Sequence, residues 1–328
     1  MNGRNRSEMI FCKELDEKYL NKIENIKINP IFILGLPRSG TSILYKMLSE
    51  TKTVNCVTSY HVIQYDQILN NHIHGNEQKA KTQINDYFDK IKLKDRGMDK
   101  LKIYADFPEE YGYILGKQTY EMNIVPENRF LFIQLCKKIQ YISENDKPLL
   151  LKNPYDFMNV SLIKNIFPNA KFIFISRHPE QILNSSMNAI RSLLKNRHPY
   201  SMITNRNYAR FYNNPLTLFF SRIFFFYYPL LGMNYLLHFF KSQVNEFNHQ
   251  YTHLPETDYV FTSYEEICKN PSQTLKKLIT FIDVKSEKNI DFDSYIKPRN
   301  IPIDPIIIRF RKLVKLKLRT YYDLFDYE

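Results

Sequence analysis

The stretch IFILGLPRSGTS, residues 31–42, decides what kind of fold this chain adopts. Its apolar start predicts a buried β-strand, and the apolar residues after it recur at helical spacing. A strand, a glycine-containing turn and a helix form the context of a phosphate-binding loop, and Gly35 and Gly40 stand in the register of the Walker pattern. That pattern also requires a lysine after the second glycine. Here the residue is Thr41, and the nearby cation is Arg38, inside the loop.

The loop contains many groups that bind anions. Glycines let the backbone turn tightly and approach a ligand, and N–H groups at a helix start face an anion with the positive end of the helix dipole behind them. Ser39, Thr41 and Ser42 add hydroxyl donors, and Arg38 adds a charged fork that suits phosphate or sulfate oxygens. The alternative is an ordinary strand-to-helix turn with a capping serine. The number of donors favours an anion site.

The residues that would hold magnesium are not evident. Kinases and ATPases use Mg²⁺ to transfer a highly charged γ-phosphoryl group. In this sequence the other apolar runs end in Lys152, Ser176 and Ser263 rather than in an aspartate. These strand-ending residues favour transfer of a less charged group, which protein cations can handle without a metal ion.

Further apolar runs place the loop in an α/β fold. Runs at 149–151, 172–175 and 259–261 predict three more buried strands, and helical patterns follow most of them. Strands that alternate with helices predict a parallel sheet with helices on both faces. We therefore expect a P-loop-like, three-layer α/β fold with a central parallel sheet flanked by helices.

The length and composition suit one large domain. Hydrophobic residues make up 44% of the 328 positions, enough for a packed core. No internal repeat or low-complexity linker divides the sequence. We expect a single domain spanning 1–328, with a core at 29–284, a mostly helical insertion at about 53–147 and a basic extension at 285–328.

The net charge of +12 indicates an anionic partner without identifying it. An anionic ligand, nucleic acid or an anionic membrane surface would each fit. The four cysteines lie far apart with no CxxC pair, which argues against a zinc site and against a disulfide scaffold. The N-terminal residues lack the apolar segment of a signal peptide, so we expect a cytoplasmic protein.

Residues 216–240, LTLFFSRIFFFYYPLLGMNYLLHFF, are long and apolar enough to raise the question of a membrane span. Arg222 lies within the run and Pro229 interrupts it, and a charged side chain is costly in lipid. We therefore expect a buried or cleft-lining pair of helices. The basic stretch 309–319 predicts a solvated helix face, and contact with a membrane surface is its alternative.

GLPRSGTSILYKML, residues 35–48, resembles the 5′-phosphosulfate loop of sulfotransferases that use 3′-phosphoadenylyl sulfate (PAPS). Their loop has proline, a cation, serine, glycine, threonine and serine or threonine in this order. The resemblance implies a PAPS-dependent, metal-independent sulfotransferase. It also implies a set of residues that hold the 5′-phosphosulfate end of PAPS: Arg38, Ser39, Gly40, Thr41 and Ser42.

A second part of the resemblance is FIFISRHPEQILNSSMNAI, residues 172–190. The family has an arginine after a strand, a proline two residues later and a serine eight residues beyond the arginine, and Arg177, Pro179 and Ser185 fit this spacing. Arg177 would lie at the carboxyl end of a strand, where α/β sheets bind ligands. The resemblance implies that Arg177 and Ser185 bind the 3′-phosphate of PAPS. Taken singly, each would be a surface residue.

Three further stretches support the resemblance. Lys152 ends a strand and would polarise the transferring sulfuryl group or its leaving oxygen, residues 96–115 resemble a pattern of bacterial-type members, and residues 264–284 resemble the usual closing unit. The chain has no tryptophan and lacks the late glycine-rich segment of cytosolic small-molecule sulfotransferases. This departure favours the broad branch of bacterial and tyrosylprotein enzymes, and it leaves a third contact to the 3′-phosphate unassigned.

The implied reaction is an in-line attack of an acceptor hydroxyl on sulfur. Arg38 and Lys152 would stabilise charge on the leaving oxygen, and a general base should take the acceptor's proton. His61 has a suitable ordinary pKa and lies just beyond the position where related enzymes have a glutamate. Glu110, with its neighbour Glu109, is the rival candidate. The simpler interpretations are a structural histidine and a solvated helix start.

Two other classes of protein stay open. A P-loop nucleotide or nucleoside kinase is the main alternative, and Thr41 in place of the lysine argues against it. A non-catalytic basic protein that binds nucleic acid or a membrane surface is the second. The charge permits it, but no motif of a nucleic-acid module is present, so we expect no nucleic acid as a partner and peripheral membrane contact stays open. A sulfotransferase fold that binds PAP without activity is a variant of the main prediction. The sequence leaves the acceptor (a small-molecule, lipid or glycan hydroxyl) and the oligomeric state undetermined.

Overall fold

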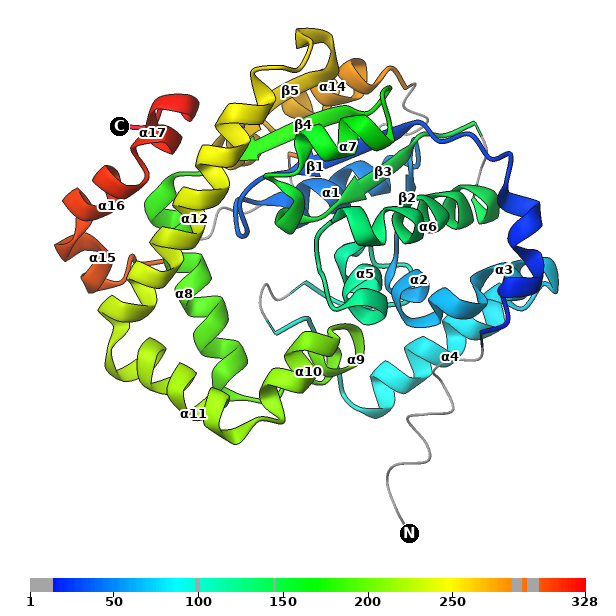
Figure 1. Cartoon of the computed structure of the whole chain (residues 1–328), viewed down its shortest axis with the longest axis horizontal. Helices are drawn as coiled ribbons and strands as arrows, with labels where there is room; N and C mark the ends of the chain where they lie inside the picture. Colours follow the sequence, from blue (N-terminus) through cyan, green and yellow to red (C-terminus); the bar gives the residue numbers. More distant parts are fainter. Residues whose placement is uncertain (1–13, 98–100, 144–145, 285–290, 294–300) are drawn as a thin grey trace.

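The computed structural model describes residues 14–97, 101–143, 146–284, 291–293 and 301–328. Within these ranges a five-stranded parallel sheet forms the centre, in the order β2-β3-β1-β4-β5 (Figure 1). The strands are β1 (Pro30–Leu34), β2 (Asn55–Cys56), β3 (Leu149–Lys152), β4 (Lys171–Ser176) and β5 (Tyr259–Ser263). The four strands predicted from apolar runs are confirmed. The short β2 was not predicted, because two residues are too few to show a periodic pattern.

β1 is buried along its whole length because both faces of the sheet are covered. Successive side chains of a strand point to opposite faces. Ile31 and Ile33 belong to one apolar cluster, with α1 (Thr41–Glu50) and α14 (Pro271–Ile282). Phe32 and Leu34 belong to the cluster on the other side. The predicted three-layer α/β fold is therefore confirmed.

Aromatic side chains fill the second cluster. Phe32 stacks on Phe172 with ring centroids 5.8 Å apart, and Phe174 meets Phe247 edge-on at 4.8 Å. The helices of this side include α6 (Arg129–Ile142), α7 (Val160–Ile166), α8 (Pro179–Lys195) and α12 (Pro229–Tyr251). A large rigid ring buries much apolar area at a small cost in side-chain entropy. The many phenylalanines of this chain thus stabilise one side of the sheet.

The register of the sheet brings the carboxyl ends of three central strands together. Ile33 pairs with Lys152 across β1 and β3, and Leu34 pairs with Phe174 across β1 and β4. The chain leaves all three strands at this edge, which is where open α/β sheets bind ligands. Lys152, at the end of β3, therefore lies beside the loop that follows β1.

The elements between β1 and β3 are mostly helical. After α1 and β2 they are α2 (Ser59–Gln64), α3 (Ile68–Ile73), α4 (Glu77–Lys90), α5 (Gly112–Thr119) and α6. Short 3-10 helices join elements here and elsewhere: η1 (Glu17–Ile23), η2 (Tyr65–Gln67), η3 (Pro126–Asn128), η4 (Pro154–Asp156) and η6 (Glu256–Asp258). α13 (Tyr264–Lys269) follows β5. How the chain divides into domains stays a prediction.

The aromatic stretch forms a bent pair of helices rather than a buried one. After α9 (Pro199–Thr204) and α10 (Arg206–Tyr212), the chain forms α11 (Pro215–Arg222), the π-helical turn η5 (Ile223–Tyr227) and α12. α12 buries Met233, Leu237 and Phe240, but α11 buries no residue. Of the expected buried or cleft-lining pair, α12 is thus partly buried, while α11 packs only the partly buried Leu218 against the sheet-side cluster. No single described helix is long and apolar enough to cross a membrane. The two helices meet that test only jointly, at a bend of 102°.

The C-terminal residues fold back onto the body of the protein. α15 (Pro305–Arg309), α16 (Arg311–Lys317) and α17 (Arg319–Phe325) pack along α12 and α8 (Figure 1). Arg311 forms an ion pair with Glu180 of α8 at 2.5 Å. Val314 and Tyr321 are buried, and the lysines of α16 are exposed. The predicted solvated basic face is present, with an apolar face opposite.

Candidate active site

The loop after β1 adopts backbone conformations that restrict its residues. Arg38 has φ 74° and Gly40 has φ 103°, both in the left-handed region. A Cβ atom on Gly40 would lie 2.6 Å from Cδ2 of Tyr264, so glycine is required there for both conformation and space. Gly40 ends the loop and α1 starts at Thr41, whose side chain is buried. The predicted strand, turn and helix are all present.

The loop and the start of α8 are joined by side-chain contacts. Arg38 Nε donates a hydrogen bond to Ser185 Oγ over 3.1 Å, and Arg177 Nη1 donates to the carbonyl of Arg38 over 3.4 Å. The guanidinium of Arg177 also lies over the Tyr264 ring, 4.3 Å from its centroid. The three residues predicted to bind opposite ends of PAPS, Arg38, Arg177 and Ser185, are therefore in one place.

Two buried donors in this cluster have no hydrogen-bond partner among the described residues. They are the hydroxyl of Ser39 and Nε of Arg177. Buried polar groups in proteins are nearly always hydrogen-bonded, so such exceptions point to a ligand. An anion with several acceptor oxygens, such as a phosphate or a sulfate, would satisfy both. The residues present thus fit the predicted anionic ligand.

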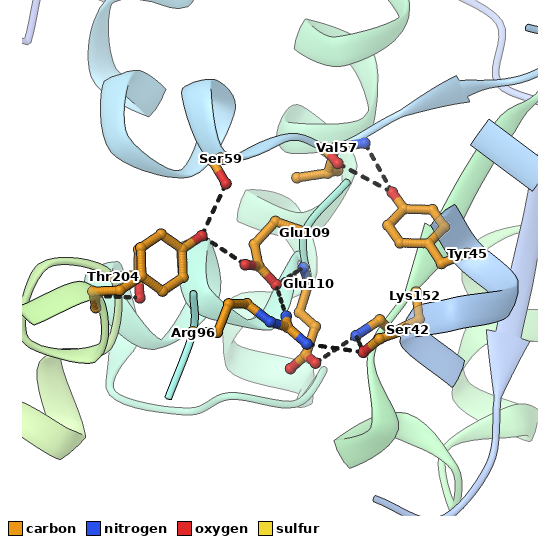
Figure 2. A network of polar contacts seen from close by, with 10 residues as sticks. Ser42, Tyr45, Val57, Ser59, Arg96, Glu109, Glu110, Lys152 and Thr204 are labelled. Carbon is orange, nitrogen blue, oxygen red and sulfur yellow. Dashed lines mark hydrogen bonds and ion pairs between the residues drawn. The ribbon is translucent and has the colours of Figure 1, made fainter. Parts of the chain in front are cut away.

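A second polar cluster lies at the end of β3. Lys152 Nζ donates to Glu110 Oε1 over 2.5 Å and to Ser42 Oγ over 3.0 Å (Figure 2). Burial lowers the pKa of Lys152, and Glu110 opposes that change. A buried ammonium with a lowered pKa is suited to donating a proton or stabilising nearby negative charge. Ser42 belongs to the loop, so this cluster adjoins the first one.

The segment before α5 places two glutamates beside the loop. Glu109 N donates to the carbonyl of Val57 over 2.9 Å, and Ser59 N donates to the carbonyl of Phe107 over 2.8 Å. These backbone bonds fix the segment against the chain that leads into α2. Glu110 is nearly buried and faces Lys152 as a result.

Glu109 has a supporting position instead. Its Oε1 accepts from Arg96 Nη1 over 2.6 Å, and its Oε2 accepts from the Tyr200 hydroxyl over 2.6 Å (Figure 2). Arg96 Nη2 also donates to Ser42 Oγ over 3.0 Å. Burial raises the pKa of Glu109, and the charge of Arg96 opposes the rise. Arg96 therefore connects Glu109 to the loop and helps to orient Ser42.

His61 is placed differently from the predicted catalytic base. It is the third residue of α2, where its Nδ1 accepts from the backbone N–H of Thr58 over 3.0 Å in a capping box. Burial lowers the pKa of His61 to about 3. Hydrogen bonds join Nδ1 of His61 to Thr58, at the start of the same helix. The geometry gives His61 a capping role, and a catalytic role for it stays an untested prediction.

The structure thus brings together all but one of the predicted site residues. The loop residues, Arg177, Ser185, Lys152 and Glu110 converge at the carboxyl edge of the sheet, and His61 does not join them. The residues that sequence reasoning left without a role are Arg96 and Tyr200, which support Glu109. Arg96 stood in a stretch that resembles the family, but nothing in the sequence marked Tyr200. Within the described ranges, no group of three or more His, Cys, Asp or Glu side chains could hold a metal ion.

Comparison with known proteins identifies the family to which the chain belongs. Residues 30–288 match the family model described as "Sulfotransferase family". The chain belongs to the sulfotransferase family. The matched part contains the loop, Lys152, Arg177 and Ser185.

Two curated sulfotransferases are similar to the chain over part of its length. They are the omega-hydroxy-beta-dihydromenaquinone-9 sulfotransferases Stf3 of Mycobacterium bovis and Mycobacterium tuberculosis, each 23% identical over 194 residues. The match covers 51% of this chain and 46% of each relative, so it spans about half the length of these sulfotransferases.

Solved sulfotransferase structures share the fold. Sulfotransferase STF9 from Mycobacterium avium superposes with a TM-score of 0.64 at 13% identity, covering 95% of this chain and 81% of that one. Sulfotransferase STF1 from Mycobacterium tuberculosis gives a TM-score of 0.53 at 15% identity, covering 82% and 71%. At such low identity these two sulfotransferases show the fold alone. They agree with the parallel sheet and its flanking helices.

Proposed function

We propose that this chain transfers the sulfuryl group of PAPS to the hydroxyl of an acceptor, in line and without a metal ion. The observation that carries the proposal is the contact of Arg38 with Ser185 beside Arg177, with unpartnered donors on Ser39 and Arg177. A ligand with an anionic group at each end, 3′-phosphate and 5′-phosphosulfate, matches a cluster that joins two anion-binding segments. Membership of the sulfotransferase family supports the same donor.

The charges of the site suit the leaving group. When sulfuryl transfer proceeds, negative charge grows on the oxygen that departs with PAP. Lys152, Arg38 and the N–H groups at the start of α1 would stabilise that charge. Lys152 is fully buried and already oriented by Ser42, so little reorganisation is needed.

Glu110 is the residue best placed to take the proton of the acceptor. Lys152 holds Oε1 of its carboxylate, which leaves Oε2 to accept from a hydroxyl. Glu109 is less suited to this role, because Arg96, Tyr200 and a backbone N–H occupy its oxygens.

The acceptor belongs to the class of hydroxyl-bearing small molecules in this proposal. The curated relatives are named for an omega-hydroxylated dihydromenaquinone, and that name supports a hydroxyl acceptor. A lipid or a glycan hydroxyl falls within the same chemistry. We propose no narrower acceptor.

A direct test uses the full chain with labelled donor and ligands. Incubation with [³⁵S]PAPS and a panel of alcohols, phenols, lipids and glycans should give a labelled product with the chelator EDTA present. PAP should raise the melting temperature, and ATP with Mg²⁺ should not. Stabilisation by ATP with Mg²⁺ alone would favour the kinase alternative and contradict the proposal. Stabilisation by PAP without any labelled product would support binding of the nucleotide and contradict the proposed transfer.

A further inference from the structure

An exposed apolar surface covers the bend between α11 and α12. We call it the hairpin face and define it by six side chains: Leu216, Phe219, Phe220, Phe226, Tyr227 and Tyr228. Their exposed fractions run from 42% to 77%. Monomeric soluble proteins rarely leave a contiguous apolar patch of this kind uncovered. α11 lies at the periphery, away from the sheet, so nothing in the core requires these rings (Figure 1).

The segment that carries the hairpin face is rich in positive charge, and Asp304, which lies beside it, is paired with Arg191 over 2.6 Å. Residues 181–245 contain seven lysine or arginine residues and no aspartate or glutamate. Among these cations, Lys195, Arg206, Arg210 and Lys241 are exposed. α16, which packs on α12, adds exposed Lys312 and Lys315. A partner that covers this surface must therefore compensate positive charge as well as bury aromatic rings.

The shape of the α11–α12 pair suits helices that lie on a membrane surface better than helices that cross the membrane. The 102° bend presents the corner at η5 and lets both helices lie across a flat surface. Helices with an apolar aromatic face and flanking Lys or Arg lie in the plane of the lipid headgroups, and tyrosine favours that depth.

A cavity of about 520 Å³ lies behind the same corner. Its walls are mainly apolar, and they include Leu193, Phe211, Phe224 and Tyr235. Ile190 and Leu194 of α8 also line it, on the side of that helix opposite Ser185. The cavity thus lies next to the hairpin face and apart from the residues of the candidate active site. Phe224 and Tyr235 belong to residues 216–240, so part of that stretch lines a cavity, as expected. Its size and lining suit a hydrocarbon chain.

We propose that the hairpin face docks on the surface of an anionic lipid bilayer. The exposed rings enter the headgroup region, and the surrounding cations meet the lipid phosphates. A second copy of this chain would bring the same cations without acidic partners, so charge complementarity favours lipid over self-association. The proposal concerns a surface separate from the PAP cluster and does not depend on the proposed activity.

Vesicle sedimentation of the full chain tests this proposal. We expect binding to phosphatidylcholine vesicles that contain phosphatidylglycerol, and much weaker binding to phosphatidylcholine alone. The variant Phe219→Ser/Tyr227→Ser removes two exposed rings, with exposed fractions of 58% and 77%, and should weaken binding by at least about tenfold. The matched control is Phe130→Ser on α6, because Phe130 is 79% exposed outside the hairpin face. This control should bind vesicles as the wild type does.

Three results would overturn the proposal. They are no binding of the wild type to anionic vesicles, equal binding to both vesicle types, or equal losses in the hairpin and Phe130 variants. Light scattering can give a fourth contradicting result. If the wild type is a dimer and the hairpin variant is a monomer, the hairpin face binds a second copy of the chain instead of lipid. PAP affinity, measured on the same samples, should be unchanged in the hairpin variant. This readout separates a failure of the docking proposal from a failure of the proposed function.

Discussion

Arg38 and Ser185 are joined by a 3.1 Å hydrogen bond although 147 positions separate them in the sequence. Arg38 lies in the loop after β1, and Ser185 lies two turns into α8, which follows β4. β1 and β4 are neighbours in the sheet, so both segments leave the same edge. The bond therefore unites two anion-binding segments into one site, with Arg177 as the third member.

The first prediction concerns the two arginines of this site. Arg38→Ala and Arg177→Ala should each weaken PAP binding by at least about tenfold, because hydrogen bonds to charged groups contribute about 1.5–3 kcal/mol. Isothermal calorimetry measures the affinity. Arg319→Ala is the matched control, since that side chain is 80% exposed and forms an ion pair with Asp323, outside the site. Wild-type affinity in both site variants would contradict the assignment of the ligand.

The second prediction compares the two candidate bases. Glu110→Gln should lower kcat by about 100-fold or more, the usual contribution of a general base, while PAP affinity stays near that of the wild type. His61→Gln should leave kcat nearly unchanged, because His61 forms the capping box of α2 and glutamine can keep that box. Turnover is measured once an acceptor is found. A large loss of kcat in the His61 variant alone would reverse the two roles.

The sequence alone predicted the parts of the site that lie within short stretches. The loop at 31–42 and the spacing from Arg177 to Ser185 are local patterns, and the sheet then brings them together. Contacts between distant segments left weaker signals. Tyr200 meets Glu109 across 91 positions, and no periodicity or motif marks that pair.

Two sequence-based expectations, for residues 216–240 and for His61, depend on surroundings that the sequence does not show. Hydrophobicity indicates that a segment will be covered but not by what, so residues 216–240 could not be assigned to the core or to a surface. α12 buries several side chains in the sheet-side cluster, while α11 buries none and packs the partly buried Leu218 against it. In the same way, the ordinary pKa of histidine gave His61 a catalytic interpretation, whereas burial at a helix start lowers the pKa of this residue to about 3.

A third prediction tests the backbone of the loop. Gly40→Ala should abolish PAP binding, because φ is 103° and the new Cβ would lie 2.6 Å from the Tyr264 ring. Gly75→Ala is the control, since Gly75 also has a positive φ, 66°, but open space around it. The control should cost about 1 kcal/mol of stability and leave binding intact. Urea unfolding and calorimetry on both variants give the comparison. Normal PAP binding by the Gly40 variant would show that the loop does not hold the ligand.

A fourth prediction concerns the buried pair of Arg96 and Glu109. Both side chains are at most 1% exposed, so removing one leaves an uncompensated buried charge. Arg96→Met should therefore lower the free energy of unfolding by about 3–5 kcal/mol. Adding Glu109→Gln removes the stranded charge and should recover part of that loss. Denaturant unfolding of the single and double variants checks this. If Arg96→Met and the double variant are equally stable, Glu109 is already protonated when Arg96 is absent.

The last prediction is a pH dependence that arises from His61. Its pKa is about 3 in the folded protein, below its ordinary value of 6.5. Between these values the unfolded chain binds a proton that the folded protein does not, so acidification favours unfolding. The stability that depends on neutral His61 is complete above pH 6.5 and is lost as pH falls toward 3, by at most about 1.4 kcal/mol per pH unit.

His61→Gln should make the loss of stability in this window less steep, because glutamine keeps the capping box without titrating. Urea midpoints measured through the acid range give the slope for each protein. His249→Gln, at an exposed position on α12, is the control and should keep the wild-type slope. Identical slopes in all three proteins would show that His61 binds protons equally in both states. The buried neutral histidine at the start of α2 would then be the wrong description.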